Sequence, residues 1–144
     1  MTTRPTPSDP FGSPINLGPE VNTPEDDMAP SISADGLTLL YSSRRPGGKG
    51  DRDLYQLTRP TVDAPFGDLV NLSINTPFIE NAAETSLDGS TLYFASDRPG
   101  GFGEIDLWRV RVVPEPSGMV LGVLGALVAL IYLGRRRDTT AGLR

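Results

Sequence analysis

The chain repeats one unit after a shift of 53 residues, and this repeat limits the folds that the sequence can adopt. A unit that recurs with a period of several tens of residues is typical of solenoids and propellers, in which each copy is one supersecondary element. So many matches at a single offset do not arise by chance, so the repeat is genuine. The matched segments are 21–24 with 74–77, 33–36 with 86–89, 39–43 with 92–96, 45–48 with 98–101, Gly50 with Gly103, and 53–55 with 106–108.

Each unit is predicted to consist of short β-strands joined by tight turns. The Asp-Gly pairs at 35–36 and 88–89 predict hairpin turns, because Gly accepts a positive φ and Asp bonds to its own backbone. Apolar residues occur on both faces of the strands that follow these turns, so we expect both faces to pack on neighbouring sheets. The predicted strands are 37–43, 52–59, 90–96 and 104–112, with 11–18 and 66–72 as outer strands that match each other after a two-residue slip.

The repeated unit resembles the WD40-like PD40 repeat of TolB-type β-propellers. The likeness covers Phe11 to Val112 and rests on a Ser-x-Asp-Gly turn, a Leu-Tyr-x-x-Ser strand, Arg-Pro-Gly-Gly and Asp-Leu-Tyr/Trp, in the same order twice. It implies propeller blades of four strands each. The predicted fold class is therefore all-β: a partial β-propeller of about two four-stranded blades, followed by one C-terminal transmembrane helix.

Two blades cannot close a propeller ring, since known rings use about four to eight blades. In closed rings an N-terminal strand often completes the last blade, so we expect 11–18 to complete the three strands at 82–112. The body should then belong to a longer chain with further blades, self-associate, or be only marginally stable. Sedimentation of residues 1–117 as a compact, well-folded monomer would refute this hypothesis.

The C-terminal segment contains an uncharged apolar run from Met119 to Leu133. With Gly118 and Gly134 it reaches the lower limit of about 17 residues for a transmembrane helix. A run this short also suits a buried core helix, but a core helix would carry a polar face, and this run has none. The sequence therefore predicts a membrane helix over 118–134, in contact with lipid.

The order Pro-Glu-Pro, apolar helix and arginine cluster resembles the PEP-CTERM sorting signal of Gram-negative bacteria. The resemblance implies an exosortase-like membrane peptidase as partner, processing near Pro-Glu-Pro, and release to the cell surface or an extracellular matrix. Without processing, the tail would anchor the chain in the cell membrane, with its body outside the cytoplasm. The residues assigned to sorting and processing are Val113, Pro114, Glu115, Pro116, Ser117, Arg135, Arg136 and Arg137.

These predictions divide the chain into five segments. They are a disordered N-terminal segment (1–10), two repeats (11–112), a sorting motif and linker (113–117), a transmembrane helix (118–134) and a basic cytoplasmic tail (135–144). Residues 1–10 contain no apolar stretch and so do not form a secretory signal peptide. We expect that Met1 is a misplaced start or that the chain is the distal piece of a longer gene. The alternative is inefficient export through the tail helix alone.

The charge and composition exclude several functional classes. Residues 1–117 carry nine Lys or Arg against seventeen Asp or Glu, a net charge of −8. Such an acidic body argues against binding to nucleic acid, which depends largely on Lys and Arg. The chain has no Cys, so it has neither disulfides nor thiolate metal sites. It has no His, so a Ser-His-Asp site with Ser42, Ser43 or Ser96 is excluded, and no cofactor is predicted.

Acidic residues near the Gly-rich turns are the remaining candidates for chemistry. Asp51 with Asp53, and Asp97 with Glu104 and Asp106, offer oxygen ligands of the kind that calcium prefers. Neither group fits a known calcium loop, so we favour a structural role in which Asp53 and Asp106 fix turns or pair with Arg45 and Arg98. The glycines resemble phosphate loops but precede strands, not helices, which predicts turns. No carboxylate pair of the glycosidase kind stands out.

The sequence therefore predicts a non-enzymatic exported or surface protein that presents loops to a protein or polysaccharide ligand. The alternative is a fragment of a larger propeller-containing hydrolase or peptidase whose catalytic domain lies outside this chain. A weaker alternative is a gene remnant that does not fold. The sequence upstream of Met1 distinguishes the first two: further blades and a signal peptide, or a catalytic domain.

Overall fold

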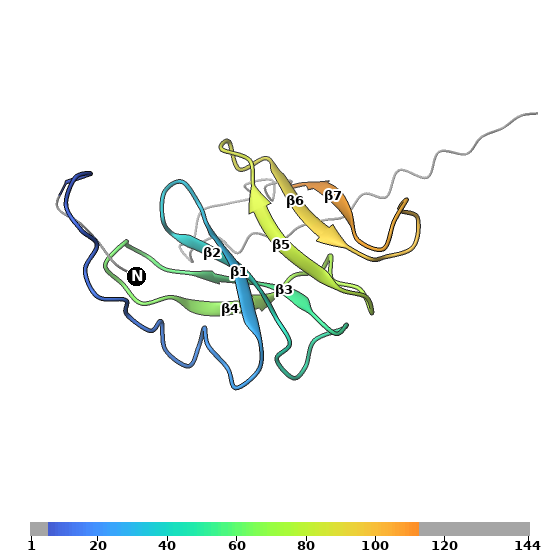
Figure 1. The fold of residues 1–144 in the computed structure, drawn as a ribbon, viewed down its shortest axis with the longest axis horizontal. Coiled ribbons are helices and arrows are strands. Elements are labelled where there is room, and N and C mark those ends of the chain that lie inside the picture. Colours follow the sequence, from blue (N-terminus) through green and yellow to red (C-terminus); the bar gives the residue numbers. More distant parts are fainter. Residues whose placement is uncertain (1–5, 113–144) are drawn as a thin grey trace, which may run out of the picture.

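A computed structural model describes residues 6–112, which form two antiparallel sheets and no helix (Figure 1). The first sheet has the order β1-β2-β3-β4 and the second the order β5-β6-β7. The all-β prediction is therefore confirmed for this part of the chain. The strands are β1 (Asp27–Ile32), β2 (Thr38–Ser43), β3 (Asp53–Thr58), β4 (Gly67–Asn71), β5 (Glu80–Thr85), β6 (Thr91–Ser96) and β7 (Asp106–Arg111).

The repeat in the sequence is also a repeat in the structure. β5, β6 and β7 begin 53 residues after β1, β2 and β3. Both predicted hairpin turns form: the N–H of Gly36 donates to the carbonyl of Ser33, and that of Gly89 to the carbonyl of Ser86, each at 2.8 Å. Gly36 and Gly89 have φ of 73° and 69°, a region that favours glycine. The same local sequence therefore produces the same meander twice.

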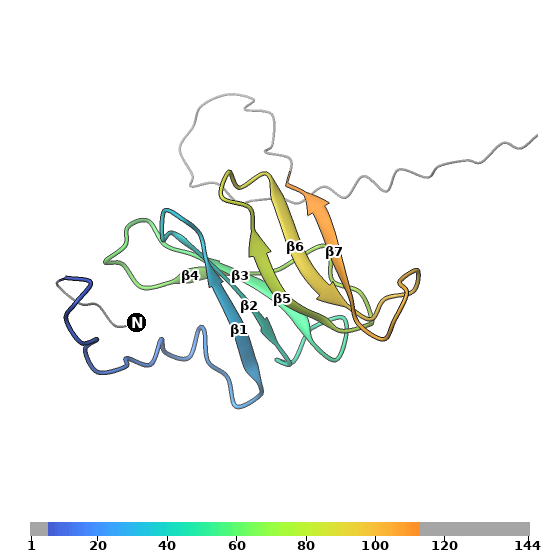
Figure 2. The same cartoon turned by 45° about the horizontal axis from the view of Figure 1, so that its top comes forward.

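The two predicted outer strands have different outcomes. The prediction of a strand at 66–72 is confirmed by β4, whereas the prediction of a strand at 11–18 is wrong. Residues 11–18 instead lead into a local turn, in which Asn16 accepts from the N–H of Gly18 at 2.8 Å. Figures 1 and 2 place this segment beside the first sheet, on the opposite side of the molecule from β7. Residues 11–18 cannot complete the second sheet, because the stacking of the two sheets keeps them away from its edge strand β7.

The two sheets stack face to face (Figures 1 and 2). We call the side of each sheet that carries Leu39 or its equivalent Leu92 the front face, and the side that carries Leu40 or its equivalent Tyr93 the back face. The back face of the first sheet packs on the front face of the second. The buried cluster between them comprises Leu40, Leu54, Leu72, Ile74, Ala83, Leu92, Phe94 and Val112, with Trp108 and Val110 packed against it. This contact holds the two units together.

The outer faces of the stack differ from each other. The front face of the first sheet forms a smaller cluster of Val21, Leu39, Tyr41, Tyr55 and Leu57. The back face of the second sheet is open: Tyr93 is 48% and Leu107 is 88% exposed. The prediction that both faces of each repeated strand pack on neighbouring sheets is therefore wrong. β2 is buried on both sides, but only its back face packs on a sheet, and the back face of β6 is exposed. The reason is that no third sheet is present among residues 6–112.

The predicted linker at 113–117, transmembrane helix at 118–134 and basic tail at 135–144 lie outside the described residues, as do residues 1–5. Among residues 6–112 there is no helix with the length and apolar character needed to cross a membrane.

Candidate functional site

A partly buried arginine organises each unit. In the first unit the guanidinium of Arg45 lies 5.2 Å from the ring centroid of Tyr41 and 4.9 Å from that of Tyr55. It also lies 3.5 Å from the carboxylate of Asp27 and donates to the carbonyl of Val21 at 2.8 Å. Arg can make these contacts at once because its planar fork both stacks and donates. This side chain therefore ties the loop before β1 to β1, β2 and β3.

The second unit repeats this arrangement at equivalent positions. The guanidinium of Arg98 lies 4.7 Å from the ring centroid of Phe94 and 5.6 Å from that of Trp108. It lies 2.9 Å from the carboxylate of Glu80, which is fully buried, and donates to the carbonyl of Ile74 at 3.1 Å. We call these two groups of residues the arginine clusters.

The acidic member of each arginine cluster was not identified from the sequence. The sequence left open whether Asp53 and Asp106 fix turns or pair with Arg45 and Arg98, and in the structure the arginines pair with other acids. Their partners are Asp27 and Glu80, one 53-residue step apart at the first position of β1 and β5. The sequence contained a signal for them, because both positions are acidic in the repeat alignment. This signal was missed because one position holds Asp and the other Glu, so the two residues are not an identical match in the repeat.

Each acid also accepts hydrogen bonds from the loop before its strand. Thr23 donates to Asp27 through its N–H and hydroxyl, and Ser43 donates at 2.6 Å. Burial raises the pKa of Asp27, but the bonds from Ser43 and Thr23 and the charge of Arg45 outweigh it, so the pKa lies below its usual 3.8. An ionised, fully bonded carboxylate of this kind stabilises the loop and is unsuited to donate a proton.

The residues weighed as metal ligands fix turns instead. Asp53 accepts from the backbone N–H groups of Lys49 and Gly50 at 2.6 and 3.0 Å. Its equivalent Asp106 accepts from those of Phe102 and Gly103 at 2.8 and 3.0 Å. The structural interpretation of these two aspartates is therefore confirmed. Among residues 6–112, no group of three or more acidic side chains is arranged to hold a metal ion.

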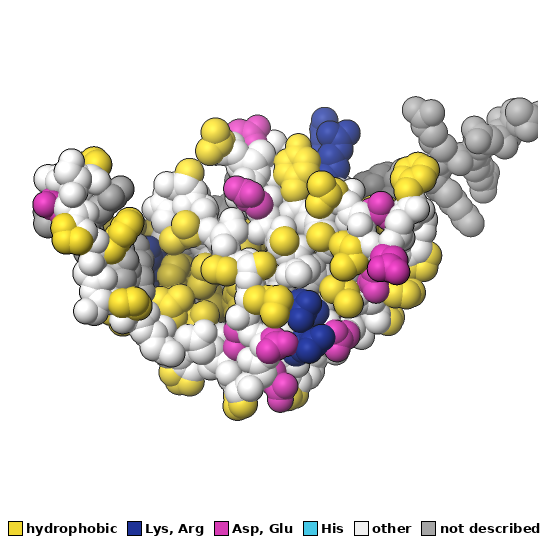
Figure 3. Space-filling view, viewed as in Figure 1, with side chains coloured by type: hydrophobic (Ala, Val, Ile, Leu, Met, Phe, Trp, Pro, Cys, Tyr) yellow, Lys and Arg dark blue, Asp and Glu magenta, His cyan; other side chains and the backbone are white. Residues whose placement is uncertain are grey.

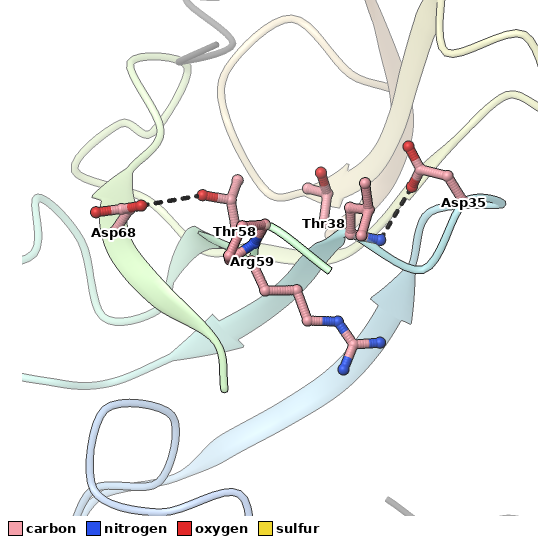
Figure 4. Close-up of a pocket in the computed structure, with 7 residues that line it drawn as sticks. Asp35, Thr38, Thr58, Arg59 and Asp68 are labelled. Atoms are coloured by element: carbon pink, nitrogen blue, oxygen red, sulfur yellow. Dashed lines mark hydrogen bonds between the residues drawn. The ribbon is translucent and has the colours of Figure 1, made fainter. Parts of the chain in front are cut away.

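A pocket of about 210 Å³ with a mixed polar and apolar lining lies at one end of the first sheet (Figure 4). Figure 4 shows Asp35 and Asp68 on opposite sides of it, with Thr58 donating to Asp68 at 3.5 Å and Arg59 pointing away from both carboxylates. Hydrogen bonding from Ser33 lowers the pKa of Asp35, which suits an acceptor and not a general acid. The pocket thus offers acceptors and hydroxyls to a polar ligand. It is lined by Asp35, Leu37, Thr38, Thr58, Arg59, Pro60 and Asp68.

Asp88, the aspartate in the hairpin turn of the second unit, leads to a prediction about how stability depends on pH. The hydroxyl of Ser86, with the N–H and hydroxyl of Ser90, lowers the pKa of Asp88 from 3.8 to about 2. A lowered folded-state pKa contributes stability that is complete above the unfolded value and is lost as pH falls towards about 2. We expect Ser86→Ala to raise the pKa of Asp88, measured by a carboxyl NMR titration. Ser33→Ala is the matched control, and an unchanged Asp88 titration in Ser86→Ala would contradict the assignment.

The sorting residues predicted from the sequence cannot be placed near these features. Val113 to Ser117 and Arg135 to Arg137 lie outside the described residues. Of the three serines considered as nucleophiles, Ser43 and Ser96 donate to the acids of the arginine clusters, and Ser42 donates to Asn81 at 2.7 Å. No family model, no curated protein and no solved structure matches this chain.

Proposed function

We propose that this chain is a non-enzymatic exported or surface protein whose body is a β-propeller binding or scaffold module. The observation that carries the proposal is the stacking of two antiparallel sheets built from one repeated meander, with strands at a constant offset of 53 residues. Blades of a propeller stack in this way, each sheet covering the face of the next. The resemblance to PD40 repeats supports the same conclusion.

The binding role is supported by the way the polar side chains are used. The acids of the arginine clusters and of the Gly-rich turns are engaged in holding loops in position. Loops that a rigid scaffold holds in place are where binding residues usually lie. The carboxylates and hydroxyls in the pocket with Asp35 and Asp68 could bond to a ligand rich in hydroxyl groups, which favours a polysaccharide.

Delivery to the envelope is supported by the sequence of the tail. Pro114-Glu-Pro116, the apolar run and Arg135 to Arg137 follow the body in the order that a sorting signal requires. An exosortase-like enzyme would act near Pro-Glu-Pro, and the arginines would remain on the cytoplasmic side. The mature body would then reach the cell surface or the extracellular matrix without its helix.

The test is the identity of the mature C-terminus, measured by mass spectrometry of the protein from cells that make it naturally. We expect a terminus near Ser117, and we expect Glu115→Ala to leave the chain uncut and in the membrane fraction. Glu104→Ala, an acidic change within the body, is the control and should leave processing unaltered. An intact Arg144 in the natural protein would reduce the tail to an anchor, and recovery of the uncut chain in the cytosol would refute delivery altogether.

A further inference from the structure

The back face of the second sheet carries two exposed arginines on its edge strand, β7. Arg109 lies opposite Tyr93 and Arg111 lies opposite Thr91, and residues paired across neighbouring strands project from the same face. The two arginines lie two positions apart on one strand, so their Cα atoms are about 7 Å apart. With Thr91 they line a hollow of about 230 Å³. Figure 3 shows basic side chains projecting beside hydrophobic ones at this end of β7.

These two arginines differ from the others in how their side chains are used. Among residues 6–112, the guanidinium groups of Arg109 and Arg111 make no ion pair and no hydrogen bond. Residues 1–117 carry nine basic against seventeen acidic residues, a net charge of −8, so carboxylates are plentiful elsewhere in the body. Two adjacent unpaired cations on such a body are suited to an anion from outside. The other arginines in this range, each held by a carboxylate or a backbone carbonyl, are Arg44, Arg45, Arg52, Arg59 and Arg98.

The first unit has neutral residues at the equivalent positions. Gln56 and Thr58 correspond to Arg109 and Arg111, and Gln56 is buried where the two sheets meet. A further sheet packed in the same way on the second back face would enclose both guanidinium groups. Burying a charge without a paired carboxylate is strongly unfavourable. The second back face is therefore suited to a hydrated, negatively charged ligand and not to another sheet of this kind.

The neighbours of Arg109 on this face narrow the chemistry of the ligand. Tyr93 is 48% exposed and lies between Arg109 on β7 and Glu84 on β5, so a carboxylate, an aromatic ring and a guanidinium form a row across the sheet. A guanidinium binds a carboxylate through two parallel hydrogen bonds. The tyrosine ring offers a flat apolar surface to the C–H face of a sugar, and an ionised Glu84 accepts from hydroxyl groups. A sugar that carries both a carboxylate and hydroxyls matches this row.

We propose that the back face of the second sheet binds an acidic polysaccharide, with Arg109 and Arg111 holding a uronate carboxylate and Tyr93 packing on the sugar ring. The inference rests on the binding role proposed above and names its ligand class. It is a different site from the pocket with Asp35 and Asp68, whose carboxylates would repel an anion. It does not depend on delivery to the envelope.

The test is isothermal titration calorimetry of the full chain in a non-ionic detergent, with polygalacturonate and alginate as uronate polymers and dextran as a neutral one. Arg109→Gln and Arg111→Thr introduce the residues that the first unit has at these positions, so the strand should tolerate them. Each should weaken binding of the uronate polymers at least about fivefold, because a charge-assisted hydrogen bond is lost. Arg44→Gln is the matched control, since Arg44 is equally charged and exposed but pairs with Asp26 and Asp51.

A second variant distinguishes a sugar from other acidic ligands. Tyr93→Leu introduces the residue of the equivalent position 40 and removes the flat ring. It should weaken binding of polygalacturonate at least about threefold, the low end for an aromatic contact, and leave binding of a poly-glutamate peptide unchanged. Leu87→Ala, which removes a 95% exposed side chain from the turn after β5, is the control. Urea unfolding followed by Trp108 fluorescence shows that each variant is folded.

The outcomes separate this inference from the proposed function. Equal losses in Arg109→Gln and Arg44→Gln would overturn the inference, because net charge alone would then explain binding. Poly-glutamate bound as tightly as polygalacturonate would mean an acidic peptide ligand and would also overturn it. Absence of binding to both uronate polymers would do the same. Dextran binding that Asp68→Asn removes and Arg109→Gln does not would support a polysaccharide-binding function in the pocket and overturn the site on the back face.

Discussion

Replacing Glu80 with alanine is expected to lower the free energy of unfolding by about 3–5 kcal/mol, the range for breaking a buried ion pair. Glu80 is fully buried and accepts from Arg98 at 2.9 Å, from Ser96 at 3.1 Å and from Thr76. Its removal leaves the partly buried guanidinium of Arg98, which contacts the rings of Phe94 and Trp108, without its counter-charge. Because a small domain has only about 5–15 kcal/mol of stability, most of the protein should unfold under mild denaturant.

Urea unfolding of the full chain, followed by the fluorescence of its single tryptophan, Trp108, measures this loss. Trp108 stacks under Arg98, so its emission reports on the same cluster. Glu84→Ala is the control because Glu84 is exposed on the same strand, and it should change stability by less than about 0.5 kcal/mol. Equal unfolding midpoints for Glu80→Ala and Glu84→Ala would contradict a stabilising role for the ion pair.

Leu54→Ala is expected to cost about 2–5 kcal/mol, as for other large-to-small changes in a core. Leu54 has no exposed surface and lies between the two sheets. Its repeat equivalent Leu107 is 88% exposed, so Leu107→Ala should cost less than about 0.5 kcal/mol. Both are measured by urea unfolding at low protein concentration, where self-association is negligible. If the two variants lost equal stability, Leu54 would not lie in the inter-unit core.

Local structure was largely predictable from the sequence. The Asp-Gly turns at 35–36 and 88–89 have the predicted hairpin geometry because glycine and aspartate determine a turn from their own backbone preferences. The structural interpretation of Asp53 and Asp106 was confirmed for a similar reason, since each accepts from backbone groups three and four residues away. Features that depend on neighbours in sequence can be predicted from the sequence.

Long-range features were predicted less well. The partner of Arg45 is Asp27, eighteen positions away, and not the nearer Asp53. Which acid meets the guanidinium depends on how β1 pairs with β2, and the spacing of the acids along the chain does not give that pairing. The predicted strand at 11–18 failed because its pairing partner would be the edge of β7, which two stacked sheets place on the far side of the molecule.

The sequence alone determined the repeat, the turns, the all-β class of residues 6–112 and the residue types on each strand face, since these follow from short-range geometry and from the alternation of side chains. Only the tertiary structure decided which of two equivalent leucines is buried. Leu54 and Leu107 have the same position in the same motif, and one is enclosed while the other is exposed. The reason is that burial of a sheet face depends on whether another sheet is there to cover it.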